Sequence, residues 1–173
     1  MKNYEFTLNF RLPESAGDPE EFVDRLAEAG CDDAIVGTGL PGRVSLQFDR
    51  TAQSAREAIQ SAIENVKAAI PGATLIEAAP DLVGLTELSS VLGISRQAVR
   101  KQMLAKADFP DPVHSGNPSL WRLNDLLSWA EINAGRSVPS ELKEVAESTF
   151  TLNLETEARR ANLRLVRQSL QNV

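Results

Sequence analysis

The side chains best suited to bind a ligand lie close together between residues 95 and 101. Arg96, Gln97, Arg100 and Lys101 fall three and four residues apart, so a helix would carry them on one side. An Arg fork can pair with guanine, and a Gln amide with adenine, in the major groove of duplex DNA. Ser95 and Lys101 suit phosphate oxygens, which fix position without reading sequence. The pattern predicts a DNA-contacting helix; the alternative is an amphipathic helical hairpin with a solvated basic face.

A helix-turn-helix is predicted to position these side chains. We expect a first helix that Thr86 caps, with Glu87 in its first turn. Gly93 would end that helix in the left-handed conformation, and Ser95 would cap a second helix over residues 96–104. The apolar positions would face inward: Leu88, Val91 and Leu92 in the first helix, Ile94 in the turn, and Ala98, Val99, Met103 and Leu104 in the second helix.

A short hairpin and a further helix are expected to follow. Residues 107–113 contain two prolines and cannot be helical throughout. Residues 113–114 and 120–122 could pair as strands around the turn-rich tip 115–119. Asn124 would then cap a helix over residues 125–132, anchored by Leu126, Leu127 and Trp129.

The string LSSVLGISRQAVRKQ, followed by DFPDPV and WRLNDLLSWA, resembles the winged helix-turn-helix of MerR-type regulators and of small AlpA/excisionase-type proteins. The resemblance covers about residues 82–133. It implies that the second helix enters the major groove and that the hairpin touches the DNA backbone or minor groove. It gives recognition-helix positions to Ser95, Arg96, Gln97, Arg100 and Lys101, and wing positions to His114 and the 115–119 tip, which includes Asn117. Many wings of this group are rich in Arg, whereas this tip has none, and only His114 and Arg122 lie near it.

The charge of the chain is unevenly distributed. The net charge is −6, but residues 1–81 hold seven Lys and Arg against fourteen Asp and Glu, whereas residues 82–135 hold five of each. Lys106 joins Arg96, Arg100 and Lys101 in a basic cluster without an intervening acid. Such a cluster supplies few phosphate contacts per subunit, so we expect weak binding by a monomer and a need for dimers. The aromatic share of 5% argues against binding of single strands by stacking.

Other functional classes find little support in the sequence. A single cysteine, Cys31, provides neither a disulfide framework nor a thiolate metal site, and no nucleophile motif accompanies the single histidine, His114. The glycine-rich residues 37–42 lead into a strand and lack lysine, so we interpret them as a hairpin loop rather than a phosphate loop. Asp32 and Asp33 fit a solvated acidic edge better than a metal site. We expect no enzyme activity, cofactor, metal or membrane segment, and a cytoplasmic location.

The first 80 residues are predicted to form a small α/β unit. Alternating apolar residues predict strands over residues 4–12 and 43–49, with further strands over 33–36 and 73–78. One helix would follow the Asp18 cap with Phe22, Val23, Leu26 and Ala29 inward; a second would follow a Thr51 cap and end at Pro71 and Gly72. The order β-α-β-β-α-β is that of the ferredoxin-like arrangement, with both helices on one face of the sheet. The junction at residues 81–83 is too short for a flexible linker, which predicts a fixed relation to the next unit.

The C-terminal part is predicted to be mainly helical. A helix should begin at Pro139 and Ser140, while residues 149–154 fit either a strand or a helix. From Glu155 onward an apolar stripe returns, comprising Leu154, Ala158, Ala161 and Leu165, extended by Leu163, Val166 and Leu170, beside a basic surface of Arg159, Arg160, Arg164 and Arg167. This apolar stripe must pack against another surface that covers it. That cover could be the first unit, a second copy of the chain or a different protein.

Together these features predict an α+β chain in three parts: a ferredoxin-like domain over residues 1–80 for interaction or dimerisation, a winged helix-turn-helix over 81–134, and a helical tail over 135–173. We expect a sequence-specific transcriptional regulator that represses its own operon as a homodimer on a palindromic operator in double-stranded DNA. The alternatives are an antitoxin-type regulator that masks a partner protein through the tail or the first domain, an excisionase-like factor that bends DNA, and an adaptor that binds no DNA.

Overall fold

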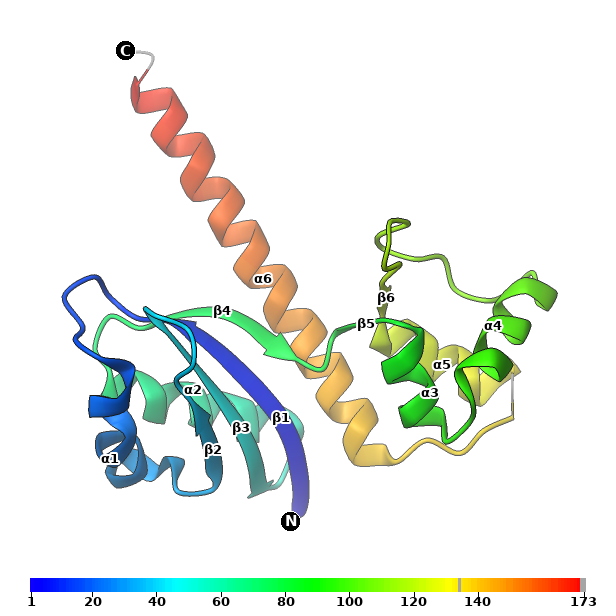
Figure 1. Cartoon of the computed structure of the whole chain (residues 1–173), viewed down its shortest axis with the longest axis horizontal. Helices are drawn as coiled ribbons and strands as arrows, with labels where there is room; N and C mark the ends of the chain where they lie inside the picture. The colour runs from blue at the N-terminus through cyan, green and yellow to red at the C-terminus, as the bar shows by residue number, and fades with distance from the viewer. Residues whose placement is uncertain (134, 172–173) are drawn as a thin grey trace.

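The computed structural model describes residues 1–133 and 135–171, with side chains up to residue 164. The chain is a mixed α+β protein, as expected. Figure 1 shows a sheet-containing unit and a smaller helical unit on either side of one long helix.

The first unit is built on an antiparallel sheet of four strands in the order β2-β3-β1-β4. These are β1 (Lys2–Arg11), β2 (Ala34–Gly37), β3 (Arg43–Ala52) and β4 (Thr74–Ala79). The predicted alternation in β1 is confirmed, because Tyr4, Phe6, Leu8, Phe10 and Leu12 are all buried. Phe6 pairs with Phe48 across β1 and β3, and their rings stack with centroids 5.1 Å apart.

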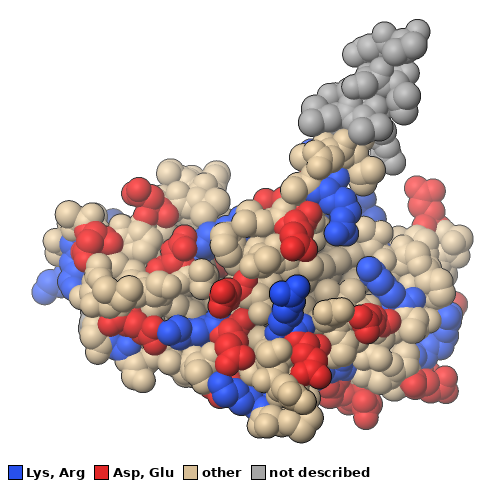
Figure 2. All heavy atoms as spheres, turned by 180° about the vertical axis from the view of Figure 1, so that it is seen from behind, with Lys and Arg blue, Asp and Glu red and all other residues tan. Residues whose placement is uncertain are grey.

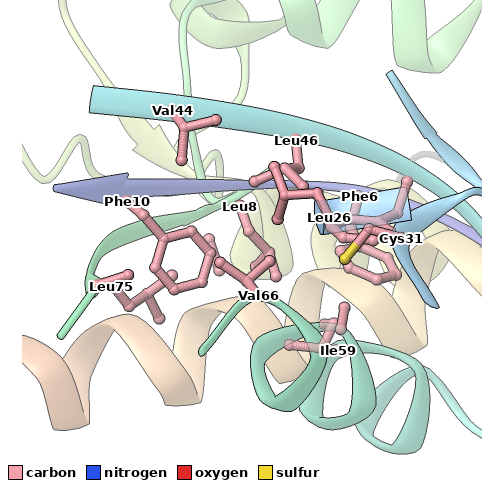
Figure 3. Close-up of a cluster of buried hydrophobic side chains, with 14 of the residues drawn as sticks. Phe6, Leu8, Phe10, Leu26, Cys31, Val44, Leu46, Ile59, Val66 and Leu75 are labelled. Carbon is pink, nitrogen blue, oxygen red and sulfur yellow. The ribbon is translucent and has the colours of Figure 1, made fainter. Parts of the chain in front are cut away.

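Helices cover the apolar face of this sheet. Two helical segments make up this cover. The first is continuous and consists of η1 (Pro19–Phe22), α1 (Val23–Leu26) and η2 (Ala27–Cys31), and the second is α2 (Ala55–Ala69). Leu26, Ile59 and Val66 from these helices meet the strand side chains in one core (Figure 3). The predicted Asp18 cap is confirmed, because the Asp18 carboxylate accepts a hydrogen bond from the Glu20 amide at 3.0 Å. Val23, expected to face inward, is instead 39% exposed.

The predicted Thr51 cap is wrong. Strand β3 continues to Ala52, because β1 begins at Lys2 and pairs with β3 as far as that residue. Thr51 therefore lies in the strand, opposite Asn3. The cap of α2 is Ser54, whose hydroxyl accepts from the Glu57 amide at 3.2 Å.

The second unit contains β5 (Leu82–Val83), α3 (Leu85–Leu92), α4 (Arg96–Ala105), β6 (Trp121–Arg122) and α5 (Leu123–Asn133). Its core includes Leu88, Val99, Trp121, Leu126 and Leu127. The expected hairpin is reduced to one bridge between His114 and Leu120, and β6 pairs with β5 instead. Helix α5 begins at Leu123, so Asn124 lies inside it and is not its cap.

The third part is one helix, α6 (Ser140–Gln171), which is about 48 Å long at 1.5 Å per residue. Residues 149–154 are helical within it. Val145 joins the core of the first unit and Ala146 that of the second, so α6 packs on both. Its inward face past this point is polar, because Thr149, Asn153 and Thr156 are buried. The predicted stripe therefore faces outward over its described part, with Leu154, Ala158 and Ala161 exposed; Leu165, Val166 and Leu170 lie outside the described side chains.

Among the described residues, no helix combines the length and the apolar character that crossing a membrane requires.

Candidate nucleic-acid interface

The start of α3 depends on Glu87 rather than on Thr86. The Glu87 carboxylate accepts a hydrogen bond from the Gly84 amide at 3.0 Å, which makes Gly84 the cap and places Thr86 inside the helix. This bond satisfies one of the amides that a helix start leaves free. At the other end Gly93 has φ 61° and ψ 32°, the left-handed conformation expected there. The chain thereby turns tightly into α4.

Helix α4 presents the predicted side chains outward. The Ser95 hydroxyl accepts from the Ala98 amide at 3.1 Å and fixes the start of the helix, as predicted. Val99 is buried, whereas Arg96, Gln97, Arg100 and Lys101 are all exposed. Leu104, expected to face inward, is instead 74% exposed, whereas Met103 beside it packs against the core.

A groove separates α4 from the loop that follows it. Its volume is about 620 Å³, and its lining includes Arg96 and Arg100 of α4 and residues 116–119 of the loop. The structure thus brings both arginines to the same groove as Asn117, from the predicted wing tip. Such a groove offers positive charge on a regular helix and polar groups on a loop.

The loop tip has its own local packing. His114 is exposed, and its ring lies over Gly116, where an added Cβ would fall 2.2 Å from the His114 Nε2 atom. A side chain at residue 116 would therefore displace this ring. His114 and Asn117 remain accessible, as a wing role needs.

The assignment of Arg122 to DNA is wrong. Arg122 is buried, and its guanidinium forms an ion pair with the buried Asp81 carboxylate. It also lies 5.2 Å from the centre of the Phe150 ring and 4.0 Å from a Glu157 carboxylate oxygen in α6. A guanidinium held in this way joins parts of the protein and is not free to reach a phosphate.

Lys106 is also engaged within the protein. Its ammonium donates to the Asn133 carbonyl at 2.9 Å and lies 5.5 Å from the centre of the Trp129 ring. Lys106 therefore ties the end of α4 to α5 in this structure, and its contact with phosphate stays a prediction.

Asp111 is a member of the groove that the sequence did not identify. It lines the groove together with Arg96 and Arg100. Asp111 lies more than ten residues along the chain from either arginine, so no periodic pattern in the sequence links it to them. Only the folded loop brings the three residues together. An acid at this position limits the groove's positive charge.

Other kinds of site receive no support from the described part of the chain. No group of three or more His, Cys, Asp or Glu residues within it could hold a metal ion. Burial raises the pKa of the Cys31 thiol to about 11, so this cysteine is a packing residue rather than a nucleophile. Comparison of the chain with protein-family models, with curated proteins and with solved structures found no match.

Proposed function

We propose that the chain is a transcriptional regulator that binds duplex DNA through a winged helix-turn-helix formed by α3, α4 and the loop after α4. The observation that carries this proposal is the set of exposed Arg96, Gln97, Arg100 and Lys101 on a capped helix beside the loop tip. In the first unit, the strand order supports a ferredoxin-like fold. That fold serves many functions, so the site and not the fold supports the role.

The proposed mechanism places α4 in the major groove. Arg96, Gln97 and Arg100 would read base edges, while Ser95, Lys101 and the loop tip would contact the backbone. With few cations per chain, a dimer would occupy a palindromic operator with its two recognition helices about one helical turn apart. Occupation of the operator would block polymerase at the protein's own promoter.

A salt-dependent titration tests this proposal. The full chain is titrated with the duplex upstream of its own gene and with a scrambled duplex of the same composition. We expect tighter binding to the upstream duplex, and a loss of about 1–3 kcal/mol of that preference with Arg96→Ala or Arg100→Ala. Lys101→Ala should weaken binding to both duplexes and reduce the salt slope by about one unit.

Arg43→Ala is the matched control, because Arg43 is an exposed arginine of the other unit. It should leave both the preference and the salt slope unchanged. Equal binding to the two duplexes, or none to either, would overturn the proposal and favour an adaptor that binds no DNA. If Arg100→Ala behaved like Lys101→Ala, Arg100 would be a phosphate contact and not a base reader.

A further inference from the structure

The sheet of the first unit has two edge strands, β2 and β4, and α6 covers the second of them. Asn153 of α6 bonds both the amide and the carbonyl of Ala78 in β4, at 2.8 Å each. Figure 1 shows β2 on the opposite side of the sheet from β4. In the described part of the chain, no hydrogen bond reaches the outer side of β2. The backbone groups on that side can therefore pair with a further strand.

The register of β2 shows which backbone groups point outward. Strand β2 pairs antiparallel with β3, and just before β2, in the same register, the Asp33 carbonyl accepts from the Asp49 amide at 3.1 Å. Along an antiparallel pair, residues that bond the neighbouring strand alternate with residues that do not. Counting from Asp33, every second residue therefore bonds β3. Ala34 and Val36 lie between these residues and direct their N–H and C=O groups outward.

The side chains of β2 leave this edge open to pairing. The strand contains no charged residue and no proline, and its pairing with β3 has no bulge, so these usual obstacles to edge pairing are absent from it. The neighbouring acid, Asp33, is already paired with Arg50 at 2.7 Å. Ile35 is 72% exposed on the face of the sheet away from the helices, because Val36 beside it packs on the core. The edge is thus uncharged and carries an exposed apolar side chain.

We propose that two copies of the chain join their β2 strands antiparallel, about a two-fold axis that passes between their Ile35 residues. In this register Ala34 of each copy lies opposite Val36 of the other, and each such pair exchanges both of its hydrogen bonds. The two Ile35 residues face each other at a position without hydrogen bonds, where opposed side chains come closest. The two sheets then form one continuous sheet.

The edge fits a second copy of itself. The outward groups of Ala34 and Val36 match under the two-fold axis, and the same register sets Asp33 opposite Gly37 of the other copy, so no acid faces an acid. Because α6 covers the β4 edge, pairing through β2 ends with two copies and does not continue into a fibre. Figure 2 shows acidic and basic side chains interspersed over the face behind that of Figure 1, so charge on that face does not select a partner of one sign.

This dimer goes beyond the proposed function by naming the surface that joins two copies. It would supply the two-fold symmetry that binding to a palindromic operator needs. The contacts that carry it lie in the first unit and do not involve DNA. The dimer can therefore be tested without DNA, and its test is independent of that of α4.

Charges at residue 35 test the register. The full chain is studied by sedimentation equilibrium as Ile35→Lys and as Ile35→Asp. Each change should raise the dimer dissociation constant by roughly tenfold or more, because the two-fold axis sets two like charges directly opposite each other. An equal mixture of the two variants should dimerise again, because Lys then faces Asp. Gln47→Lys and Gln47→Asp are the matched controls at an exposed position of β3, opposite Ile35, and should leave the dissociation constant unchanged.

A cysteine at residue 35 measures the same contact directly. Opposed residues at a position without hydrogen bonds have Cα atoms about 4.5 Å apart, a separation that a disulfide can span. Ile35→Cys should therefore form a covalent dimer under mild oxidation. Gln47→Cys should not, because two strand spacings more would separate its copies by roughly 14 Å. The wild type, whose Cys31 is buried, gives the background.

Several results would overturn the proposal. They are a monomeric wild type, dimers indifferent to both charges at residue 35, a mixture of folded variants that stays monomeric, and cross-linking of Ile35→Cys no greater than that of Gln47→Cys. Circular dichroism of every variant checks that its secondary structure is that of the wild type. A monomeric wild type would leave the β2 edge to a strand of a different protein. None of these outcomes bears on whether α4 binds DNA, which the titration measures separately.

Discussion

Glu144 connects the first turns of α6 to β1. Its carboxylate accepts from the Lys2 ammonium at 2.8 Å and from the hydroxyl of the buried Tyr4 at 2.6 Å. The hydrogen bond from Lys2, followed by that from Tyr4, lowers the pKa of Glu144 below its ordinary value of 4.5. A carboxylate with a lowered pKa stabilises the fold above its unfolded pKa, and this stabilisation is lost as pH falls through the folded pKa.

The pH dependence of stability should therefore contain a contribution from Glu144. Between about pH 6 and about pH 3, the free energy of unfolding should fall less in Glu144→Gln than in the wild type, because Gln cannot take up the proton. Urea denaturation at a series of pH values measures this difference. Glu28→Gln, at an exposed position of the first unit, should keep the wild-type dependence. Identical curves for Glu144→Gln and the wild type would show that this contact does not stabilise the fold.

Arginines show where sequence reasoning about single residues succeeds and where it fails. Arg96 and Arg100 could be placed on the outer side of α4, because helical spacing and the Ser95 cap are local properties. Arg122 could not be placed, because its partner Asp81 is 41 residues away and no pattern links them. Both kinds of arginine look alike in the sequence, and only long-range packing separates a surface cation from a buried one.

At the scale of elements, α6 protects an edge of the sheet. Strand β4 is an edge strand whose outer backbone groups would otherwise lack partners. Asn153 donates to the Ala78 carbonyl and accepts from the Ala78 amide, both at 2.8 Å. Thr149 donates to the Pro80 carbonyl at 2.6 Å, and Arg160 to those of Leu75 and Ile76 at 2.9 and 2.8 Å. Side chains of a helix thus take the place of a fifth strand.

Asn153→Ala should test this protection. It leaves the amide and the carbonyl of Ala78 without their side-chain partner in a buried place, at a cost of about 1–3 kcal/mol for each group that water cannot reach. Chemical denaturation measures the loss. Asn162→Ala makes the same change at an exposed position of the same helix and should alter stability by no more than about 0.5 kcal/mol. Equal effects of the two changes would mean that Asn153 does not protect the edge.

The same contact explains why α6 was harder to predict than the strands and α2. Those elements bury apolar side chains against other apolar side chains, so periodicity locates them. From Thr149 onward, the buried residues of α6 are Thr149, Asn153 and Thr156, and Thr149 and Asn153 bond backbone groups at the β4 edge. In this part of the helix the apolar Leu154, Ala158 and Ala161 lie on the outer face, and the alternation in residues 149–154 resembles that of a strand. A pattern of apolar residues cannot reveal an interface whose chemistry is polar.

At the scale of the whole molecule, one buried polar cluster joins the two units and α6. The Asp81 carboxylate accepts from Arg122, in β6, and from the Asn153 amide of α6 at 2.8 Å. The Asp81 carbonyl accepts from the Leu123 amide at 2.7 Å. This cluster supports the fixed relation that the short junction predicts. In a symmetric dimer, a fixed relation would also determine the separation of the two recognition helices, and with it the spacing of the operator half-sites.

The cluster should make the two units unfold together. Both tryptophans, Trp121 and Trp129, lie in the second unit, so their fluorescence reports its unfolding, while hydrogen exchange of the amides of β1 and β3 reports that of the sheet. In the wild type both probes should give the same free energy of unfolding. Arg122→Met removes the partner of a buried carboxylate, which costs about 3–5 kcal/mol. The fluorescence transition should then move to lower denaturant, while the sheet amides keep more of their protection.

Arg100→Met supplies the comparison, because it makes the same change on the exposed side of α4. By both probes, its free energy of unfolding should stay within about 0.5 kcal/mol of that of the wild type. Arg100→Met should also weaken DNA binding, whereas the folded fraction of Arg122→Met should bind DNA with the wild-type salt slope. If Arg122→Met shifted both probes equally, contacts other than this cluster would couple the units. If it left both unchanged, the ion pair between Arg122 and Asp81 would contribute nothing to the stability of the junction.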